Sequence, residues 1–314
     1  LKDVQVKIAK GEYLGVYEAK KLLFKDFTTQ YLEWSKANKT PKSHERDIYS
    51  LKALSTFFTG YLSAITAKDV EAYKAGRIEE VEPATVNREV ACIRHMLNLA
   101  VRWGYLRENP IKGVKMLKEP PGRLRYLTEE EIRGLLQGSP SHLRPIIVCA
   151  LNTGMRKGEI LNLRWSEVNL KERRILIRGS KTNELRAIPI NETLLQELKK
   201  LPRHLSSDYV FWNKDKGGKR YVDVSTAFEN ALSQAGIKDF RFHDLRHTFA
   251  SHLAMRGVSL RAIAQLLGHR TLQMVMRYSH LSPEHLQGAV GLLDEVMGAS
   301  NGHHMDTRLQ IQKS

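Results

Sequence analysis

Apolar residues in residues 23–112 recur at intervals of three and four, which is the spacing of one face of an α-helix. The clearest stripe lies in residues 83–106 and consists of Val86, Val90, Ile93, Leu97 and Val101. Thr85 precedes this stripe and is placed to cap the helix. Residues 43–58 and the segment that begins at Thr66 predict two further helices. Without any alternating strand pattern, this region predicts a bundle of about four helices.

The periodic pattern stops at residues 113–126, whose sequence GVKMLKEPPGRLRY contains two adjacent prolines and several basic residues. Such a composition is typical of a linker between two domains. Thr128 and Glu131 follow with the spacing of a capping box and predict the start of a new helix. We therefore predict a possible remnant of an N-terminal module at 1–22, a helical domain at 23–112, the linker at 113–126, a second domain at 127–297 and a disordered tail at 298–314.

One short part of the second domain has the alternation of a β-hairpin. Ile175 and Ile177 alternate with polar residues, GSKTN supplies turn residues, and residues 185–190 return as a second strand. Lys181 would lie near the tip of this hairpin, where a lysine is ordinarily solvated. The chain is therefore predicted to be mainly α, with a helical first domain and an α+β second domain that holds a small antiparallel β-sheet.

The charge of the chain favours a polyanionic partner. Lys and Arg number 50 against 34 Asp and Glu, which gives a formal net charge of +16. The sequence has no apolar run of about 18 residues and no lipidation signal, so nucleic acid is favoured and no membrane partner is expected. The candidates for DNA contact, each of which could instead be an ordinary solvated side chain, are Arg46, Lys52, Arg88, Arg94, Arg123 and Arg125.

Cysteine and histidine usage argues against a metal site. Cys92 and Cys149 both lie in apolar helical patterns, which predicts reduced core thiols in a cytoplasmic protein rather than disulfide partners. The adjacent His303 and His304 fall in the aperiodic tail and favour a disordered polar end over a ligand pair. We therefore expect neither a metal nor another cofactor.

Three residues of the second domain occupy positions that suit an anion. In NTGMRKGEILNLRW, Arg156 lies at the start of a predicted helix, with Glu159 one turn later. A cation at the positive end of a helix dipole is easier to understand if an anion binds there, although an ion pair with Glu159 would also explain it. In FRFHDLRHTFASHLAMRG, His243 and Arg246 are spaced to share one helical face. His247 and His252 have no comparable partner, so we interpret them as surface or supporting residues.

The segment GHRTLQMVMRYSHL, residues 268–281, places a histidine and a tyrosine close together in the chain. Gly268 ends a predicted helix and leaves His269 just beyond its C-terminus. Thr271 can cap a short helix that carries Tyr278. Taken alone, Tyr278 could be one more core aromatic, since the chain has 11 tyrosines and buried tyrosines are common.

As a set, these motifs resemble the tyrosine recombinases, also called the phage integrase family. The matching elements occur in order and are TGMRKGE with Arg156, the hairpin with Lys181, His243-x-x-Arg246, LLGH ending at His269, and MRYSHL with Tyr278. The resemblance covers residues 23–297 and implies a core-binding, SAM-like DNA-binding domain followed by a catalytic domain. It also implies that the two domains form a C-shaped clamp on DNA.

The chemistry of strand breakage and rejoining assigns roles to these residues. A covalent phosphotyrosine at Tyr278 would store the energy of the broken phosphodiester, and Arg156 and Arg246 could stabilise the charge on the phosphate in the transition state. The resemblance implies that Lys181 protonates the leaving 5′-oxygen. His243 would take or return the tyrosine proton, and His269 would hydrogen-bond the phosphate or orient the site. Glu159 would support Arg156 or the His243 region.

The resemblance also implies partners. They are double-stranded DNA recombination sites, a homotetramer on that DNA, and accessory DNA-bending or directionality proteins, in the nucleoid of a prokaryotic or phage-infected cell. A helix from Pro283 onward, capped by Ser282, could pack on its own domain or dock on a neighbouring protomer, and the resemblance favours the neighbour. An integrase and a chromosome-dimer resolvase both fit. A type IB topoisomerase and a non-catalytic DNA-binding protein of the same fold are the alternatives.

Overall fold

The structure is a computed structural model that describes residues 21–120, 122–178, 185–269 and 271–282. The chain divides into two compact units, Leu1–Gly122 and Arg123–Ser314. Each unit has its own hydrophobic core, and the two are described separately below.

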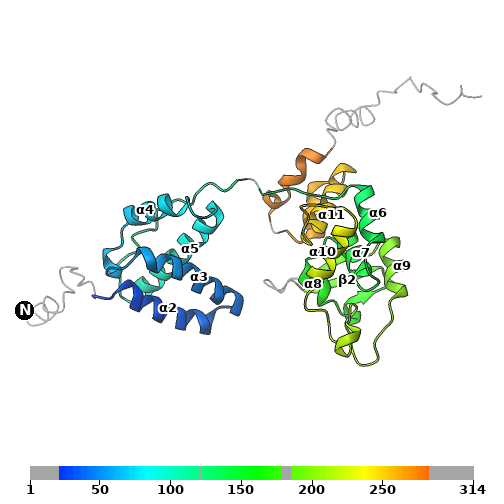
Figure 1. Cartoon of the computed structure of the whole chain (residues 1–314), viewed down its shortest axis with the longest axis horizontal. Coiled ribbons are helices and arrows are strands. Elements are labelled where there is room, and N and C mark those ends of the chain that lie inside the picture. The colour runs from blue at the N-terminus through cyan, green and yellow to red at the C-terminus, as the bar shows by residue number, and fades with distance from the viewer. Residues whose placement is uncertain (1–20, 121, 179–184, 270, 283–314) are drawn as a thin grey trace, which may run out of the picture. The chain divides into compact units, whose positions relative to one another are not determined.

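The first unit is helical, as the sequence predicts, and its helices run from blue to cyan in Figure 1. They are α2 (Phe24–Asn38), α3 (Pro41–Phe57), the short 3-10 helix η1 (Leu62–Ala64), α4 (Ala67–Arg77) and α5 (Pro83–Arg102). The predicted cap of α4 is confirmed, since Thr66 and Asp69 form a reciprocal capping box. The predicted cap of α5 is wrong. This helix begins two residues before Thr85, because Pro83 has a fixed φ suited to a first helical position and Glu82 is the N-cap.

The core of the first unit forms around α5. Four of the five predicted stripe residues, Val86, Val90, Ile93 and Leu97, are fully buried, and Val101 lies at the margin of the core. Phe24 and Phe27 of α2 and Leu51 and Leu54 of α3 belong to the same core. The helical periodicity therefore predicts the packing of this unit as well as its secondary structure.

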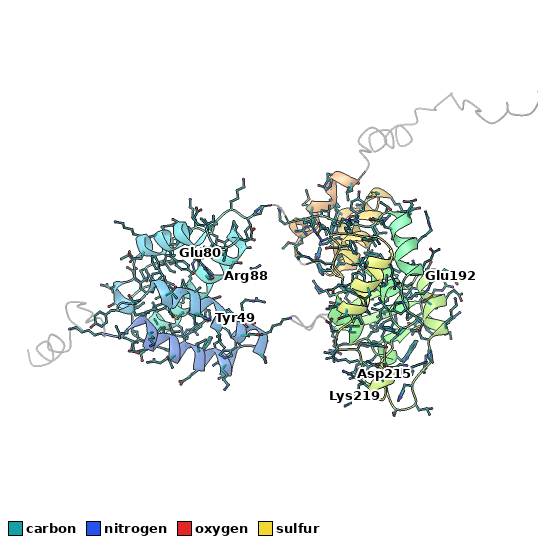
Figure 2. The ribbon with its side chains drawn as sticks, in the orientation of Figure 1. Tyr49, Glu80, Arg88, Glu192, Asp215 and Lys219 are labelled. Atoms are coloured by element: carbon teal, nitrogen blue, oxygen red, sulfur yellow. The ribbon has the colours of Figure 1, made fainter. Side chains whose placement is uncertain are left out.

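The second unit combines helices with a three-stranded antiparallel sheet, as predicted. Its helices are α6 (Glu129–Gln137), α7 (Arg144–Thr153), α8 (Lys157–Leu161), α9 (Glu192–Lys200), α10 (Ser225–Gln234), α11 (Asp244–Met255) and α12 (Leu260–Leu267). The sheet has the order β1-β2-β3, with β1 (Val168–Asn169), β2 (Arg174–Arg178) and β3 (Leu185–Pro189). Short 3-10 helices are η2 (Trp165–Glu167), η3 (Lys214–Lys216), η4 (Leu272–Met274) and η5 (Met276–Leu281). Asp215 and Lys219 mark the loop around η3 (Figure 2).

Two separate cores hold the second unit together. The larger one joins α7, which is buried along most of its length, to inward residues of the sheet such as Ile175 and Ile188, which pair across β2 and β3. The smaller core joins α11, α12 and the end of the described chain, and it contains Leu267, Val275 and Tyr278. Tyr278 is therefore fixed by packing on α11, which carries Arg246, and on α12, which His269 follows.

Cys92 and Cys149 are buried free thiols, one in each unit, and burial raises the pKa of both to about 12. Neither thiol is therefore ionised near neutral pH, which fits the prediction of reduced core residues. Within the described ranges, no helix is long and apolar enough to cross a membrane. The same ranges contain no group of three or more His, Cys, Asp or Glu side chains placed to hold a metal ion.

Candidate active site

Arg156 is placed by a sharp turn at the end of α7. Gly154 ends that helix with a left-handed backbone at φ +61°, and Arg156 then serves as the N-cap of α8. Its Nη1 donates to Glu159 Oε1 at 3.0 Å, and the other oxygen of the same carboxylate accepts the Arg156 backbone N–H at 2.9 Å. The ion pair considered in the sequence is thus present. It uses one of the five guanidinium donors, and the side chain is 45% exposed, so donors remain for an anion.

Arg246 lies in the first turn of α11 and is only 4% exposed. Its Nη1 donates to the carbonyl oxygen of Gly154 and its Nη2 to that of Leu267, each at 2.6 Å. These carbonyls lie at the C-terminal ends of α7 and α12, where the helix dipole favours a cation. Burial, followed by the charges of Arg156 and Arg186, lowers the pKa of Arg246 to about 10. The guanidinium is therefore charged at neutral pH and rigidly held.

His243 and His269 lie close enough to these arginines to be influenced by their charge. His243 is the N-cap of α11, and burial together with Arg246 lowers its pKa. His269 follows Gly268, the left-handed residue that ends α12. Burial, then Arg246 and Arg156, lower the pKa of His269 to about 4. Its Nδ1 is buried without a hydrogen-bond partner among the described residues, so this neutral ring has a polar atom available for a ligand.

Tyr278 lies on η5 and is 1% exposed. Its hydroxyl is 2.6 Å from Nδ1 of His247, the residue that follows Arg246 on α11. Burial raises the pKa of Tyr278, while the charges of Arg277 and Arg246 act to lower it. The hydroxyl is therefore a neutral phenol in the resting protein, with cations nearby to favour its ionisation.

These contacts narrow one sequence interpretation and correct another. The sequence left His247 as either a surface or a supporting residue, because helical spacing cannot show which segment packs over that part of α11. The structure places its ring in direct contact with the Tyr278 hydroxyl. His252, by contrast, is partly buried and its Nε2 lies 2.8 Å from the carbonyl oxygen of Leu127. Thr271 makes no side-chain cap bond, and it precedes η4 rather than the η5 helix that carries the tyrosine.

Arg186 on β3 was not considered from the sequence, yet it links the two arginines of the site. Its Nη2 donates to Glu159 Oε2 at 2.9 Å, so Glu159 lies between Arg156 and Arg186. Its Nη1 donates to the carbonyl oxygen of Leu267, which also accepts from Arg246. One signal was available, because Arg186 has the same strand phase as the buried Ile188, and an arginine in that phase needs a buried partner.

Lys181 falls within residues 179–184, outside the described residues, so its proposed role stays a prediction. The strands on either side, β2 and β3, are paired through Arg178 and Leu185.

The candidates for DNA contact fall into two groups. Arg46 and Lys52 on α3 are exposed. Arg88 on α5 is exposed too, and it is the one of the three that Figure 2 labels. The other three have partners within the protein: Arg94 donates to the Val114 carbonyl, Arg123 pairs with Asp239 and Asp244, and Arg125 pairs with Glu131. A DNA phosphate would have to share these three guanidinium groups with their present partners. Arg46, Lys52 and Arg88 are exposed and could contact a phosphate directly.

The second unit thus brings together two arginines, three histidines with lowered pKa values and a buried tyrosine. Residues 125–285 match the family described as "Phage integrase family", and residues 23–116 match the "Phage integrase SAM-like domain". The chain belongs to the phage integrase family, whose members are tyrosine recombinases.

Curated relatives agree with this assignment. The integrase of Salmonella phage P22 is 34% identical over 230 residues, which are 69% of this chain and 59% of the relative. The integrase of Escherichia phage 186 is 33% identical, with 71% of this chain and 64% of the relative covered. Tyrosine recombinase XerA of Pyrococcus furiosus is 33% identical, with 58% and 67% covered. The chain thus spans about three fifths of the length of the two phage integrases.

Solved structures show the same fold at low sequence identity. A crystal structure of a lambda integrase dimer bound to a COC′ core site matches with a TM-score of 0.69 and 21% identity, covering 88% of this chain and 85% of the other. A lambda integrase tetramer bound to a Holliday junction matches with a TM-score of 0.67 and 21% identity, covering 86% of each chain.

Replacement of Gly154 tests how tightly the Arg246 anchor is built. A Cβ there would lie 2.5 Å from Phe249 Cδ1 and 2.7 Å from Leu267 Cδ2, with a left-handed backbone besides. Gly236 has a similar φ of +67° but open space around its Cβ, so Gly236→Ala is the matched control. We expect Gly236→Ala to lower the free energy of unfolding by about 1–2 kcal/mol from backbone strain. Gly154→Ala should cost about 1–3 kcal/mol more from overpacking. Equal losses in urea denaturation would contradict the crowding.

Arg186 and Glu159 are suited to a double-mutant cycle followed by urea denaturation. Burial alone would raise the pKa of Glu159, but its bond from the Arg156 N–H and the charges of Arg186 and Arg156 lower it. We expect Arg186→Met to lower the free energy of unfolding, because the partly buried Glu159 carboxylate loses one of its two arginine partners. Adding Glu159→Gln should recover part of this loss. The coupling energy between the two substitutions should be about 1–3 kcal/mol. Additive losses would show that the pair contributes nothing.

The pH dependence of the same variants follows from the sign of this shift. Because the folded pKa of Glu159 lies below its ordinary value, its stabilisation is present above that ordinary value and is lost as the pH falls through the folded pKa. Arg186→Met raises the folded pKa, so the variant should lose less stability than the wild type on acidification.

Proposed function

We propose that this chain is a site-specific DNA recombinase that breaks and rejoins DNA strands through a 3′-phosphotyrosyl intermediate, in the integration or excision of a mobile element. The observation that supports it most is the buried Tyr278 hydroxyl, which shares a hydrogen bond with His247 and is influenced by the charge of the anchored Arg246. The phage integrases among its relatives favour the mobile-element context.

In this proposal the Tyr278 oxygen attacks the scissile phosphorus, and its ester with the DNA 3′ end keeps the energy of the broken bond for rejoining. The reaction first requires the phenol to lose its proton, and burial makes that loss harder. The positive charges of Arg277 and Arg246 act in the opposite direction. A phosphate bound beside these cations would bring the electrophile to the hydroxyl at the same time.

Arg156 and Arg246 would stabilise the negative charge that develops on the non-bridging oxygens. Arg246 is suited to this role because two backbone carbonyls fix its guanidinium before DNA arrives, so little reorganisation is needed. Arg156 is more exposed and can reach a phosphate with its remaining donors. His269, neutral at physiological pH, would donate a hydrogen bond to the same phosphate. Glu159 would orient both Arg156 and Arg186.

The leaving 5′-oxygen needs a proton, and we assign its delivery to Lys181. The 5′-hydroxyl of a partner strand would then attack the phosphotyrosine, which exchanges the strands and releases Tyr278. No step in this sequence requires the protein to supply a metal or another cofactor, because the two arginines and Lys181 can provide charge stabilisation and the proton.

The DNA partner would be a pair of double-stranded recombination sites held by a homotetramer. Lambda integrase has been solved as a tetramer on a Holliday junction. The net charge of +16 and the exposed Arg46, Lys52 and Arg88 support contact with the DNA backbone. Docking of the segment from Pro283 onward on a neighbouring protomer remains part of the proposal, but that segment lies outside the described residues. Accessory DNA-bending or directionality proteins and a location at the nucleoid are likewise proposed.

Tyr278→Phe tests the nucleophile. The variant should bind DNA with unchanged affinity, because only one buried oxygen is lost, and it should form no covalent adduct. A DNA substrate nicked near the scissile phosphate traps the adduct of the wild type, and a denaturing gel shows whether protein is attached to a 3′ end. An adduct at the wild-type level with the variant would exclude Tyr278 as the nucleophile.

Lys181→Ala tests the general acid. Cleavage of an ordinary phosphodiester should fall by about 100-fold or more, the usual contribution of a positioned acid. A substrate with a 5′-thiol leaving group needs no protonation and should restore the rate. Lys171→Ala, an exposed lysine in the turn between β1 and β2, is the control for loss of positive charge. If the thiol substrate restores nothing, the acid is another residue.

A further inference from the structure

The contact between His247 and Tyr278 gives the nucleophile a specific neighbour. Their rings lie 5.9 Å apart at 48°, and Nδ1 is 2.6 Å from the hydroxyl oxygen. His247 comes from α11, which also carries Arg246, while Tyr278 comes from η5. The two residues are therefore brought together only by the packing of the small core.

The direction of this hydrogen bond follows from the need to satisfy a buried phenol. Tyr278 is 1% exposed, and His247 Nδ1 is the hydrogen-bond partner of its hydroxyl among the described residues. A proton on Nδ1 would leave the phenol O–H without an acceptor among the described residues, which is costly for so deeply buried a group. The hydroxyl therefore donates, and His247 accepts as a neutral ring with its proton on Nε2.

We infer that His247 is a catalytic residue of the proposed recombination reaction, the base that accepts the Tyr278 proton as the tyrosine oxygen attacks the phosphorus. The inference rests on the proposed function. The O–H bond of Tyr278 breaks and its proton moves to Nδ1, the bond from this oxygen to phosphorus forms, and the bond from phosphorus to the 5′-oxygen breaks. That oxygen takes a proton from Lys181. On rejoining, the 5′-oxygen forms its bond to phosphorus and returns its proton to Lys181, the bond from phosphorus to the Tyr278 oxygen breaks, and that oxygen takes back the proton from Nδ1.

His243 is placed differently. Its ring is perpendicular to that of His247, with centroids 5.4 Å apart, and the hydrogen bond to the Tyr278 hydroxyl comes from His247. The role first expected for His243, as acceptor of the tyrosine proton, thus passes to its neighbour one helical turn later. His243 is left free to contact the phosphate.

The surroundings of His247 link its basicity to bound DNA. Four charged or titratable groups influence the pKa of His247. They are His243, the N-cap of α11, Asp244 and Arg246 within α11, and Arg277 of η5. Burial is the largest influence and, with His243 and Arg277, lowers the pKa of His247 to about 4. A phosphate diester among these cations would offset their repulsion and raise the basicity of the ring. The base would therefore become effective only when a phosphate is in place.

His247→Asn separates proton transfer from hydrogen bonding. The asparagine Oδ1 is attached at the same position as Nδ1 and can still accept from the tyrosine, but it cannot take the proton. We expect single-turnover cleavage of the nicked substrate to fall by about 100- to 10,000-fold, as for other general bases, with DNA affinity unchanged. His252→Asn, on the same helix but bonded to the Leu127 carbonyl, is the matched control and should cleave at the wild-type rate.

A difluorinated tyrosine in place of Tyr278 distinguishes a base from a residue that only supports the structure. If His247 were purely structural, the more acidic tyrosine would not change the cleavage rate of His247→Asn. The fluorinated phenol is more acidic and depends less on a base, so it should restore much of the rate lost in His247→Asn. A 5′-thiol leaving group should not, because it relieves the acid step instead.

The outcomes distinguish this inference from the proposed function. Absence of any adduct with the wild type would overturn the recombinase itself. A wild-type adduct together with full-rate cleavage by His247→Asn would overturn only the role of His247. The role of His247 would also be overturned if the fluorinated tyrosine restored cleavage by His243→Asn but not by His247→Asn.

Discussion

The buried guanidinium of Arg246 is the interaction on which the site depends. Its two hydrogen bonds end on the carbonyls of Gly154 and Leu267, the last turns of α7 and α12. One side chain therefore fixes the relative position of three helices and of the segments that follow two of them. Arg156 comes two residues after Gly154, and His269 comes two residues after Leu267. The geometry around the phosphate position is set by a cation that is itself held by helix ends.

The same arrangement adds to the effect of burial in keeping the surrounding histidines neutral. Burial is the largest cause of the lowered pKa of His269, and the charges of Arg246, Arg156 and Arg186 lower it further. Glu159 is the carboxylate that pairs with two of these arginines. A cluster of three guanidinium groups around one carboxylate keeps excess positive charge, and binding a phosphate would relieve that repulsion. Without a ligand, the site therefore carries positive charge that its own carboxylate does not neutralise. A DNA-cleaving enzyme needs such a charge to bind a phosphate.

Helices and strands could be predicted from the sequence where one local pattern is enough to define the element. The stripe of α5, the helix cap at Thr66, the capping box at Thr128 and the two strands of the hairpin follow from local pattern, and the structure confirms them. The N-terminus of α5 was misplaced because proline at the first position overrode the threonine cap.

The site was harder to predict, because its contacts join segments far apart in sequence. Arg186 reaches Glu159 and Leu267 across 27 and 81 residues, and His247 reaches Tyr278 across 31. The family resemblance supplied Arg156, Arg246 and His269, which we propose contact the phosphate. It did not supply Arg186 and His247, whose places depend on how β3 and η5 pack on the rest of the unit.

Packing also places Tyr278 beside the other candidate site residues of its own chain. The tyrosine is buried with Ala250, Ile263 and Leu267 of its own chain, and its hydroxyl bonds His247 of the helix that carries Arg246. Moving the ring from this core into water would cost about 1.5–3 kcal/mol for a side chain of this kind. The described residues thus place Tyr278, His247 and Arg246, to which we assign the roles of nucleophile, base and phosphate clamp, together within one chain.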